Sequence, residues 1–247
     1  MPGTWTEELV GGHPCHLYEP PQRNKHNYVV MYLHGVHLGQ LHEKPAFLDV
    51  LDRHGLPVVC PVTQRSWWAD KICPEFDPEI TAERHVLDNM LPFLKERYEA
   101  VPPQIALLGT SMGGQGALRL AFKHHETFPI VAAISPAIEF HQRWDHEDGV
   151  LPTMFRDPED ARQETAILYA GPFNWIRHLY FCCDPEDELW FDSSDRLHMK
   201  LSSMGIPHTC ELEATAGGHG FEYYNTMAAA AIDFIANALD RERLRIV

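Results

Sequence analysis

The sequence contains no apolar run long enough to cross a bilayer, so we expect no transmembrane helix. Its first residues, MPGTWTEE, hold neither a basic region nor an apolar core, and they lack the pattern of a secretory signal peptide. Positive charge is also scarce, since 20 Lys and Arg stand against 35 Asp and Glu, for a formal net charge of −15. This excess of negative charge disfavours nucleic acids and anionic membranes as partners, and we expect neither.

Cysteine is sparse, and its spacing fits no metal-binding finger. We expect the cysteines to be small buried hydrophobic side chains in a reducing cytoplasm. They are Cys15, Cys60, Cys73, Cys182, Cys183 and Cys210. The spacing is also compatible with a bridge between Cys60 and Cys73. No repeat, low-complexity tract or linker divides the chain, so we expect one domain over residues 1–247.

Apolar segments alternate with helical patterns along the chain. Strands are predicted within 5–20 (one or two edge strands) and at 28–33, 56–62, 105–108, 130–135, 178–183 and 207–212. Helices are predicted at 44–53, at 79–98 with a kink or break at Pro92, from the turn after 105–108 to about His125, and at 193–204 and 221–239. This alternation predicts an α/β fold whose mostly parallel central sheet has helices on both faces.

Residues 136–177 depart from that alternation. They contain shorter helical pieces, including 158–169, with turn residues between them. Open α/β sheets bind ligands beyond the carboxyl ends of their strands. We therefore expect 136–177 to form a short cap insertion over that end of the sheet.

The strongest chemical signal lies in residues 105–118, IALLGTSMGGQGAL. An apolar strand there meets Gly-x-Ser-x-Gly and then a helical pattern, which is the context of a nucleophile elbow. Gly109 and Gly113 leave room for neighbouring backbone, and Ser111 is the candidate nucleophile. The first N–H groups of the following helix have no helical acceptor, so the backbone N–H of Met112 is a candidate oxyanion donor. The alternative is an ordinary Gly/Ser turn before a helix.

A serine nucleophile needs a histidine as general base and a carboxylate to orient that histidine. His219, in Gly-Gly-His-Gly between the last strand and the last helix, is the candidate base. His198 and His208 are weaker candidates because they lie in helix and strand patterns. The acid is expected in the loop after the preceding strand. We favour Asp187, which apolar residues follow, and we keep Asp184 as the second candidate.

The loop after strand 28–33 is expected to supply the second oxyanion donor, through the backbone N–H of Val36. His34, His37 and His42 in the same region could instead form a metal cluster. Their spacing fits no common zinc pattern, and we expect neither a metal nor a cofactor.

Several aromatic residues are candidates for substrate binding. Trp67 and Trp68 lie in a long loop, and Trp144 lies in the predicted cap. Together with His37 they could line a pocket for an acyl or aryl group. For each tryptophan the alternative is packing in the core or the cap.

These segments resemble the esterase D-like family of α/β-hydrolases, the “Putative esterase” group. The resemblance covers residues 28–240 and is carried by the motifs YLHG, GTSMGGQGAL, SP, DPEDA and GGH. That group includes S-formylglutathione hydrolases, feruloyl and acetylxylan esterases and mycolyltransferases. The resemblance implies an α/β-hydrolase fold and places Ser111, Asp187 and His219 at the positions of the family's catalytic residues.

The sequence therefore predicts a cytoplasmic serine carboxylic-ester hydrolase that acts on a small-molecule ester through an acyl-enzyme. Thioesterases, S-formylglutathione hydrolases and acyltransferases use the same three residues, and these alternatives stay open. A catalytically silent hydrolase fold that binds a ligand is the alternative from a different class. The natural ester and the oligomeric state are left open.

Overall fold

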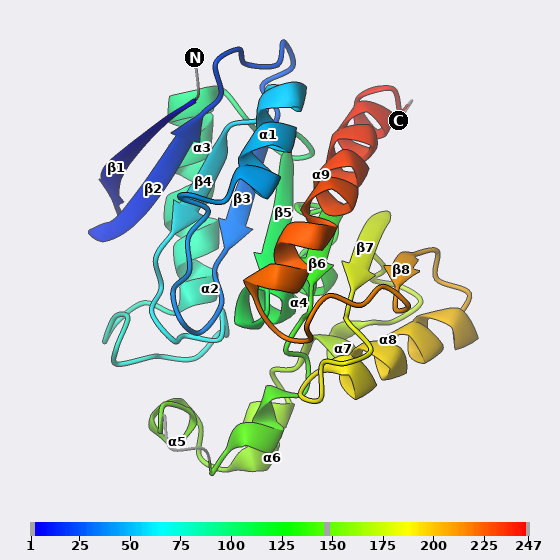
Figure 1. Ribbon diagram of the computed structural model, residues 1–247. Helices are drawn as coiled ribbons and strands as arrows, with labels where there is room; N and C mark the ends of the chain where they lie inside the picture. The colour runs from blue at the N-terminus through cyan, green and yellow to red at the C-terminus, as the bar shows by residue number, and fades with distance from the viewer. Residues whose placement is uncertain (1–2, 146–148, 246–247) are drawn as a thin grey trace.

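The chain forms one eight-stranded sheet with helices on both faces (Figure 1). The computed structural model describes residues 3–145 and 149–245. The strands are β1 (Thr4–Val10), β2 (His13–Glu19), β3 (Val29–Leu33), β4 (Val58–Pro61), β5 (Ile105–Thr110), β6 (Ile130–Ile134), β7 (His178–Cys182) and β8 (Thr209–Glu211). Their order across the sheet is β1-β2-β4-β3-β5-β6-β7-β8. Strand β2 pairs antiparallel with both β1 and β4. The strands from β4 to β8 in this order pair in parallel.

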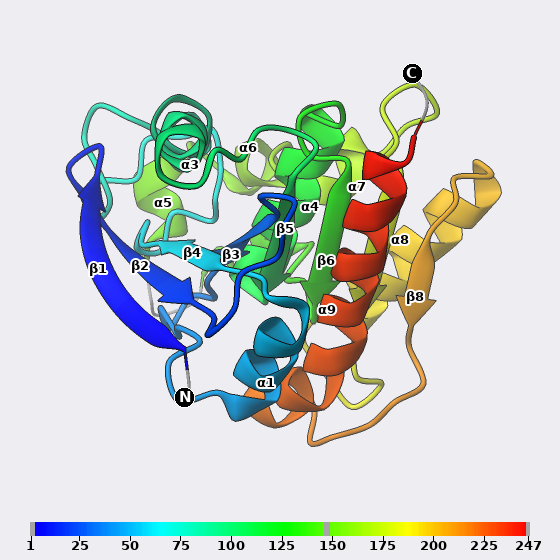
Figure 2. The same cartoon turned by 90° about the horizontal axis from the view of Figure 1, so that it is seen from above.

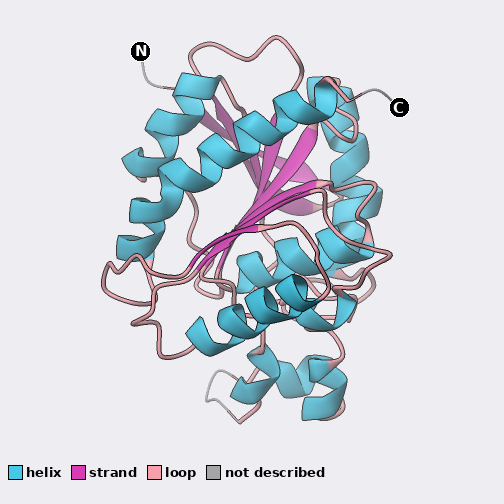
Figure 3. Cartoon of the chain, turned by 90° about the vertical axis from the view of Figure 1, so that its right-hand side faces the viewer, coloured by secondary structure: helices cyan, strands magenta, loops and turns pink. Residues whose placement is uncertain are grey.

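Helices cover the sheet on both sides (Figures 2 and 3). They are α1 (Pro45–His54), α2 (Ala82–His85), the π-helix η1 (Val86–Met90), α3 (Leu91–Tyr98), α4 (Met112–Lys123), the 3₁₀ helix η2 (Phe140–Arg143), α5 (Leu151–Met154), α6 (Pro158–Arg162), α7 (Ala166–Tyr169), α8 (Phe191–Ser203) and α9 (Phe221–Arg243). In Figure 2, α1 and α9 lie on one face, and α3, α4 and α8 lie on the other. Among the described residues, no helix combines the length and the apolar character that crossing a bilayer requires.

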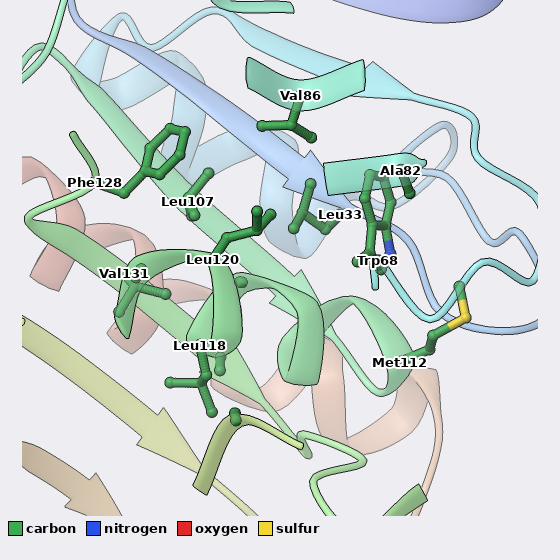
Figure 4. Packing of buried hydrophobic residues seen from close by; sticks show 14 of the residues in the cluster. Leu33, Trp68, Ala82, Val86, Leu107, Met112, Leu118, Leu120, Phe128 and Val131 are labelled. Carbon is green, nitrogen blue, oxygen red and sulfur yellow. The ribbon is translucent and has the colours of Figure 1, made fainter. Parts of the chain in front are cut away.

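Two hydrophobic cores result, because successive side chains of a strand point to opposite faces. In β3, Met31 and Leu33 belong to the core on the α4 side, whereas Val30 and Tyr32 belong to the core under α1 and α9. Figure 4 shows Leu33 in the first core, together with residues of α4 and η1. The central strands β3, β4, β5 and β6 are buried along their whole length. The sheet is therefore a rigid support for the loops at its carboxyl edge.

Element boundaries differ from the predictions in three places. The predicted helix 79–98 begins at Ala82 instead of residue 79, and the kink or break predicted at Pro92 is confirmed as the π-helix η1 between α2 and α3, because proline removes a backbone donor and clashes with the preceding turn. The predicted piece 158–169 is two short helices, α6 and α7. The last helix continues to Arg243 rather than Leu239. The other strands and helices lie within a few residues of their predicted positions.

All six cysteines are unpaired thiols, and five of them are buried as predicted. The alternative bridge between Cys60 and Cys73 is not formed. The exception to full burial is Cys210 in the edge strand β8, which is half-buried.

The segment 136–177 contains η2, α5, α6 and α7, and Figure 1 shows α5 and α6 beyond the carboxyl ends of the strands. Residues 146–148 of the predicted cap lie outside the described residues. The role of this segment as a cap stays a prediction.

A buried ionic cluster joins α4 to its surroundings. The guanidinium of Arg119, in α4, donates to Glu83 of α2 and to Glu164, which lies between α6 and α7. Burial acts to raise the pKa of Glu83, but hydrogen bonding from His124 and the charge of Arg119 hold it at about 2. The Glu83 carboxylate therefore stays charged and fixes the helix that begins at the elbow.

We expect Arg119→Ala to lower the free energy of unfolding by about 3–5 kcal/mol, because two buried carboxylates lose their shared partner. Urea unfolding followed by circular dichroism measures this change. The matched control is Arg53→Ala, which breaks an exposed pair with Asp233 and should cost no more than about 1 kcal/mol. Equal losses in the two variants would contradict a structural role for the buried cluster.

Candidate active site

Ser111 lies in a tight turn between β5 and α4. Its backbone φ of 54° and ψ of −120° are strained for a residue with a side chain. Two hydrogen bonds of 3.0 Å hold the turn: the Ser111 N–H donates to the Ile134 carbonyl, and the Ala137 N–H donates to the Ser111 carbonyl. A Cβ on Gly113 would lie 1.8 Å from the Leu33 carbonyl oxygen, so this position requires glycine. These are the features of the predicted nucleophile elbow.

Three side chains from separate loops form one hydrogen-bonded chain. Ser111 Oγ lies 2.9 Å from His219 Nε2, and His219 Nδ1 lies 2.7 Å from Asp187 Oδ2. Because a carboxylate only accepts, His219 Nδ1 carries the proton and Nε2 offers its lone pair to the serine hydroxyl. Asp187 is 1% exposed, and its other oxygen accepts backbone N–H groups of the following residues, which fix its orientation. Such an arrangement can take a proton from a serine hydroxyl.

Asp184, the second candidate for the acid, has a different position. Its Oδ2 accepts the backbone N–H groups of Ala216 and Gly218, at 2.7 and 2.9 Å. Its Oδ1 accepts the N–H of Glu186. Although burial raises its pKa, these N–H groups hold the pKa of Asp184 below its ordinary value. Asp184 therefore supports the loop that carries His219 and makes no direct contact with the imidazole.

The loop after β3 passes beside the serine. A Cβ on Gly35 would lie 3.3 Å from Ser111 Cβ, so Gly35 lets the two segments approach closely. The Leu38 N–H donates to the Gly35 carbonyl and closes a turn that contains Val36. Val36 lines the same cavity as Ser111. The N–H of Met112, the first residue of α4, has no acceptor within the helix.

His34 supports this loop from beneath. Its ring is buried, with Nδ1 2.9 Å from the Gly35 carbonyl oxygen and Nε2 accepting the backbone N–H of Thr63 at 3.1 Å. Burial lowers the pKa of His34 to about 4, so the ring is neutral. The neutral ring therefore links the loop that carries Val36 to the segment after β4 through two hydrogen bonds.

The alternative metal cluster of His34, His37 and His42 is wrong for the described residues. His34 uses one nitrogen on the Gly35 carbonyl and the other on the Thr63 N–H. His42 stacks on Trp5, and His37 is exposed. Their ligand atoms form no group that could hold an ion.

A cavity of about 310 Å³ opens onto the serine. Its wall is mainly apolar, and the large apolar side chains in it are Trp67, Trp144, Val150, Leu151, Leu189, Trp190 and Phe221. His37 also lines it, so the structure brings three of the four predicted substrate-binding residues to one cavity. The predicted substrate-binding role of Trp68 is wrong, and the alternative of packing in the core holds. Trp68 is fully buried, packs against Gly116 and donates from Nε1 to the His34 carbonyl, and it therefore belongs to the core.

Tyr224 belongs to this site although no sequence pattern predicts it. Its hydroxyl oxygen lies 2.9 Å from His219 Nε2, and the side chain lines the cavity. Burial raises the pKa of Tyr224 well above its ordinary value, so the hydroxyl keeps its proton. In the sequence it is one more aromatic residue of the first turns of the last helix, with no signal that separates it from core residues.

Comparison with known proteins places the chain among esterases. A family model described as “Putative esterase” matches residues 12–231. A comparison with curated proteins gives no match.

Solved structures share the whole architecture. A ferulic acid esterase superposes with a TM-score of 0.74 at 16% identity, over 96% of this chain and 99% of that chain. FphF, a fluorophosphonate-binding serine hydrolase of Staphylococcus aureus, gives 0.72 at 17% identity, over 96% and 100%. An S-formylglutathione hydrolase of Agrobacterium tumefaciens gives 0.72 at 18% identity, over 96% and 94%. These likenesses confirm the predicted α/β-hydrolase fold, and with the family match they show that the chain belongs to the “Putative esterase” family.

Proposed function

We propose that this protein is a serine carboxylic-ester hydrolase with Ser111 as nucleophile, His219 as general base and Asp187 as the acid that orients it. The observation that carries the proposal is the unbroken hydrogen-bonded chain of 2.9 and 2.7 Å that ends on a strained serine facing a cavity. The cavity matters because it gives an ester access to the serine hydroxyl. Membership of an esterase family supports the same reaction class.

The reaction begins at the serine hydroxyl. His219 Nε2 takes the proton as Ser111 Oγ attacks the ester carbonyl carbon, and Asp187 stabilises the imidazolium that forms. The carbonyl oxygen becomes an oxyanion, which the backbone N–H groups of Val36 and Met112 stabilise. The imidazolium then gives its proton to the alcohol oxygen as the carbon–oxygen bond breaks. Water then attacks the acyl carbonyl carbon while His219 Nε2 takes its proton. His219 returns that proton to Ser111 Oγ as the bond to the acyl group breaks, and the acid is released.

The lining and the volume of the cavity indicate the polarity and the size of the acyl group. Its large apolar side chains favour a hydrophobic acyl or aryl group, and its volume of about 310 Å³ limits the length of that group. We therefore expect esters of medium-length acids to be better substrates than acetate esters.

A series of p-nitrophenyl esters from acetyl to decanoyl tests this proposal. We expect kcat/KM to rise from acetyl to a medium-length acyl group and to fall by decanoyl, because the longest chain exceeds the cavity. A parallel thioester series addresses the alternative with the same residues. Absence of hydrolysis across the ester series, or consistently faster hydrolysis of matched thioesters, would contradict the carboxylic-ester assignment.

The Tyr224 hydroxyl and Ser111 Oγ both lie 2.9 Å from His219 Nε2, so Tyr224 is placed to donate a hydrogen bond to the alcohol oxygen as it receives the proton from His219 and leaves. We expect Tyr224→Phe to lower kcat/KM for alkyl esters by about 5–10-fold, the worth of one hydrogen bond. p-Nitrophenyl esters should be much less affected, since p-nitrophenolate leaves without a proton. The measurement compares ethyl and p-nitrophenyl esters of one acid.

The control for Tyr224→Phe is Tyr28→Phe, which removes a hydroxyl hydrogen-bonded to Asp240 away from the cavity. It should leave both esters unaffected. An equal loss on both esters in Tyr224→Phe would indicate a purely structural role for the hydroxyl.

A further inference from the structure

Three potential metal ligands meet at the edge of the sheet, away from the residues of the proposed catalytic chain. His198 lies in α8, and His208 and Cys210 lie just before and within the edge strand β8. His198 Nδ1 is 2.8 Å from His208 Nε2 and 3.1 Å from Cys210 Sγ. Within residues 3–145 and 149–245, these three side chains form the group of His, Cys, Asp and Glu that could hold a metal ion, and their ligand atoms all lie within 4.8 Å of one another.

The protonation of the two rings makes this convergence notable. His208 Nδ1 lies 2.8 Å from the Ile206 carbonyl oxygen, and it must carry a proton there because a carbonyl only accepts. His208 Nε2 therefore turns a lone pair toward His198 Nδ1. A single proton on His198 Nδ1 can satisfy this contact, and the Cys210 sulfur at 3.1 Å can then only share that proton as a weak acceptor. A cation between the three atoms uses all of them.

The surroundings match those of a metal site. The bond from His208 Nδ1 to a carbonyl is the outer contact that orients metal-bound histidines, and the ring also stacks on Phe181. The carboxylates of Glu211 and Asp195 act on the Cys210 sulfur electrostatically, and a bound dication offsets those two charges. All three ligand side chains are half-buried, so an ion can reach them from solvent.

We propose that His198, His208 and Cys210 bind Zn²⁺, with water as the fourth ligand. Two imidazole nitrogens and one thiolate are a donor set typical of tetrahedral zinc. Binding releases the thiol proton of Cys210, and the proton of His198 moves from Nδ1 to Nε2. Zinc bond lengths separate tetrahedral ligand atoms by about 3.3–3.6 Å, so the two contacts of His198 Nδ1, with His208 Nε2 and with Cys210 Sγ, must lengthen by about 0.5 Å.

The ion would act as a clamp between α8 and β8. The loop that carries Asp187 leads into α8, and the loop that carries His219 follows β8. A shared ion would therefore hold together the two elements next to these loops. This inference does not depend on the proposed esterase activity, because binding and stability are measured without substrate.

The test uses the full chain after removal of metal with a chelator. We expect calorimetry to give one Zn²⁺ site and Co²⁺ to give the thiolate charge-transfer band and the intense visible bands of a tetrahedral complex. Cys210→Ser should abolish the charge-transfer band, and Cys210→Ser and His198→Gln should each weaken Zn²⁺ binding by more than about 10-fold. At one Zn²⁺ concentration, the rise in Tm should be larger for the unmodified protein than for either variant.

His26→Gln is the matched control, because it removes an exposed histidine far along the chain from the three ligands. Its Zn²⁺ affinity and Co²⁺ spectrum should be unchanged. Circular dichroism establishes that each variant is folded, and His198→Gln keeps the test valid if Cys210→Ser does not fold. Absence of saturable binding, a Co²⁺ spectrum without the thiolate band, or unchanged affinity in both folded ligand variants would overturn the proposal and leave a hydrogen-bonded cluster only.

Discussion

Ser111→Ala should lower kcat for p-nitrophenyl esters by about 10⁴–10⁶-fold while the protein stays folded. The reason is that the proposed acyl-enzyme cannot form without the hydroxyl that lies 2.9 Å from His219 Nε2. Alanine fits the site because only the oxygen is removed, and the backbone bonds of the turn remain. The small residual rate would come from the oxyanion donors and from substrate binding. Steady-state hydrolysis and thermal unfolding measure the two parts of this prediction.

The matched control for Ser111→Ala is Ser202→Ala, which removes an exposed hydroxyl on α8. It should leave both kcat and Tm unchanged. If Ser111→Ala retained more than a small fraction of the activity, another residue would have to be the nucleophile. A large fall in Tm would instead mean that the loss of activity reports unfolding.

Asp187→Asn should lower kcat by about 10⁴-fold, since an amide facing His219 Nδ1 favours the tautomer whose Nε2 carries the proton. That tautomer cannot accept the proton of Ser111. Stability should change little, because the Asp187 oxygen that accepts the N–H groups of Leu189 and Trp190 has a counterpart in asparagine. Kinetics and thermal unfolding of the same preparation test both statements.

Asp184→Asn is the informative comparison. Asp184 accepts backbone N–H groups with both oxygens, and one of them would face an amide NH₂ in the variant. We expect a loss of about 1–3 kcal/mol in stability and a fall in kcat of less than about 10-fold. A larger loss of activity in Asp184→Asn than in Asp187→Asn would reverse the two assignments.

Much of this architecture could be predicted because local sequence patterns determine it. Gly109, Ser111 and Gly113 specify a turn that few other residues can form, and the structure has that turn. The preference for Asp187 over Asp184 depended on its greater distance from the end of the strand and on the apolar residues that follow it, and the structure places Asp187 against His219. Chain order and loop position were therefore sufficient to identify which side chains come together.

Features that depend on packing between distant segments could not be predicted. Trp67 and Trp68 are adjacent in the sequence, yet one lines the cavity and the other lies in the core. The interior position of Arg119 follows from its partners Glu83 and Glu164, which lie on other elements. A helical pattern alone gives no signal of such partners.

The cluster at the sheet edge shows the same limit. His198 is separated from His208 and Cys210 by the turn between α8 and β8, and their spacing matches no common metal motif. Only the packing of α8 beside the edge strand brings the three ligand atoms together. Tyr224 likewise acquires its place beside His219 from the path of the loop that precedes α9.

The measurement that tests the central proposal most directly is covalent labelling with a fluorophosphonate, read by intact mass and peptide mapping. This reagent traps an activated serine, so labelling does not require knowledge of the natural ester. We predict one adduct per chain, on Ser111, and no adduct in Ser111→Ala. A folded protein that takes up no label, or a Ser111→Ala variant that is labelled as fast as the unmodified protein, would contradict the assignment of Ser111 as the nucleophile.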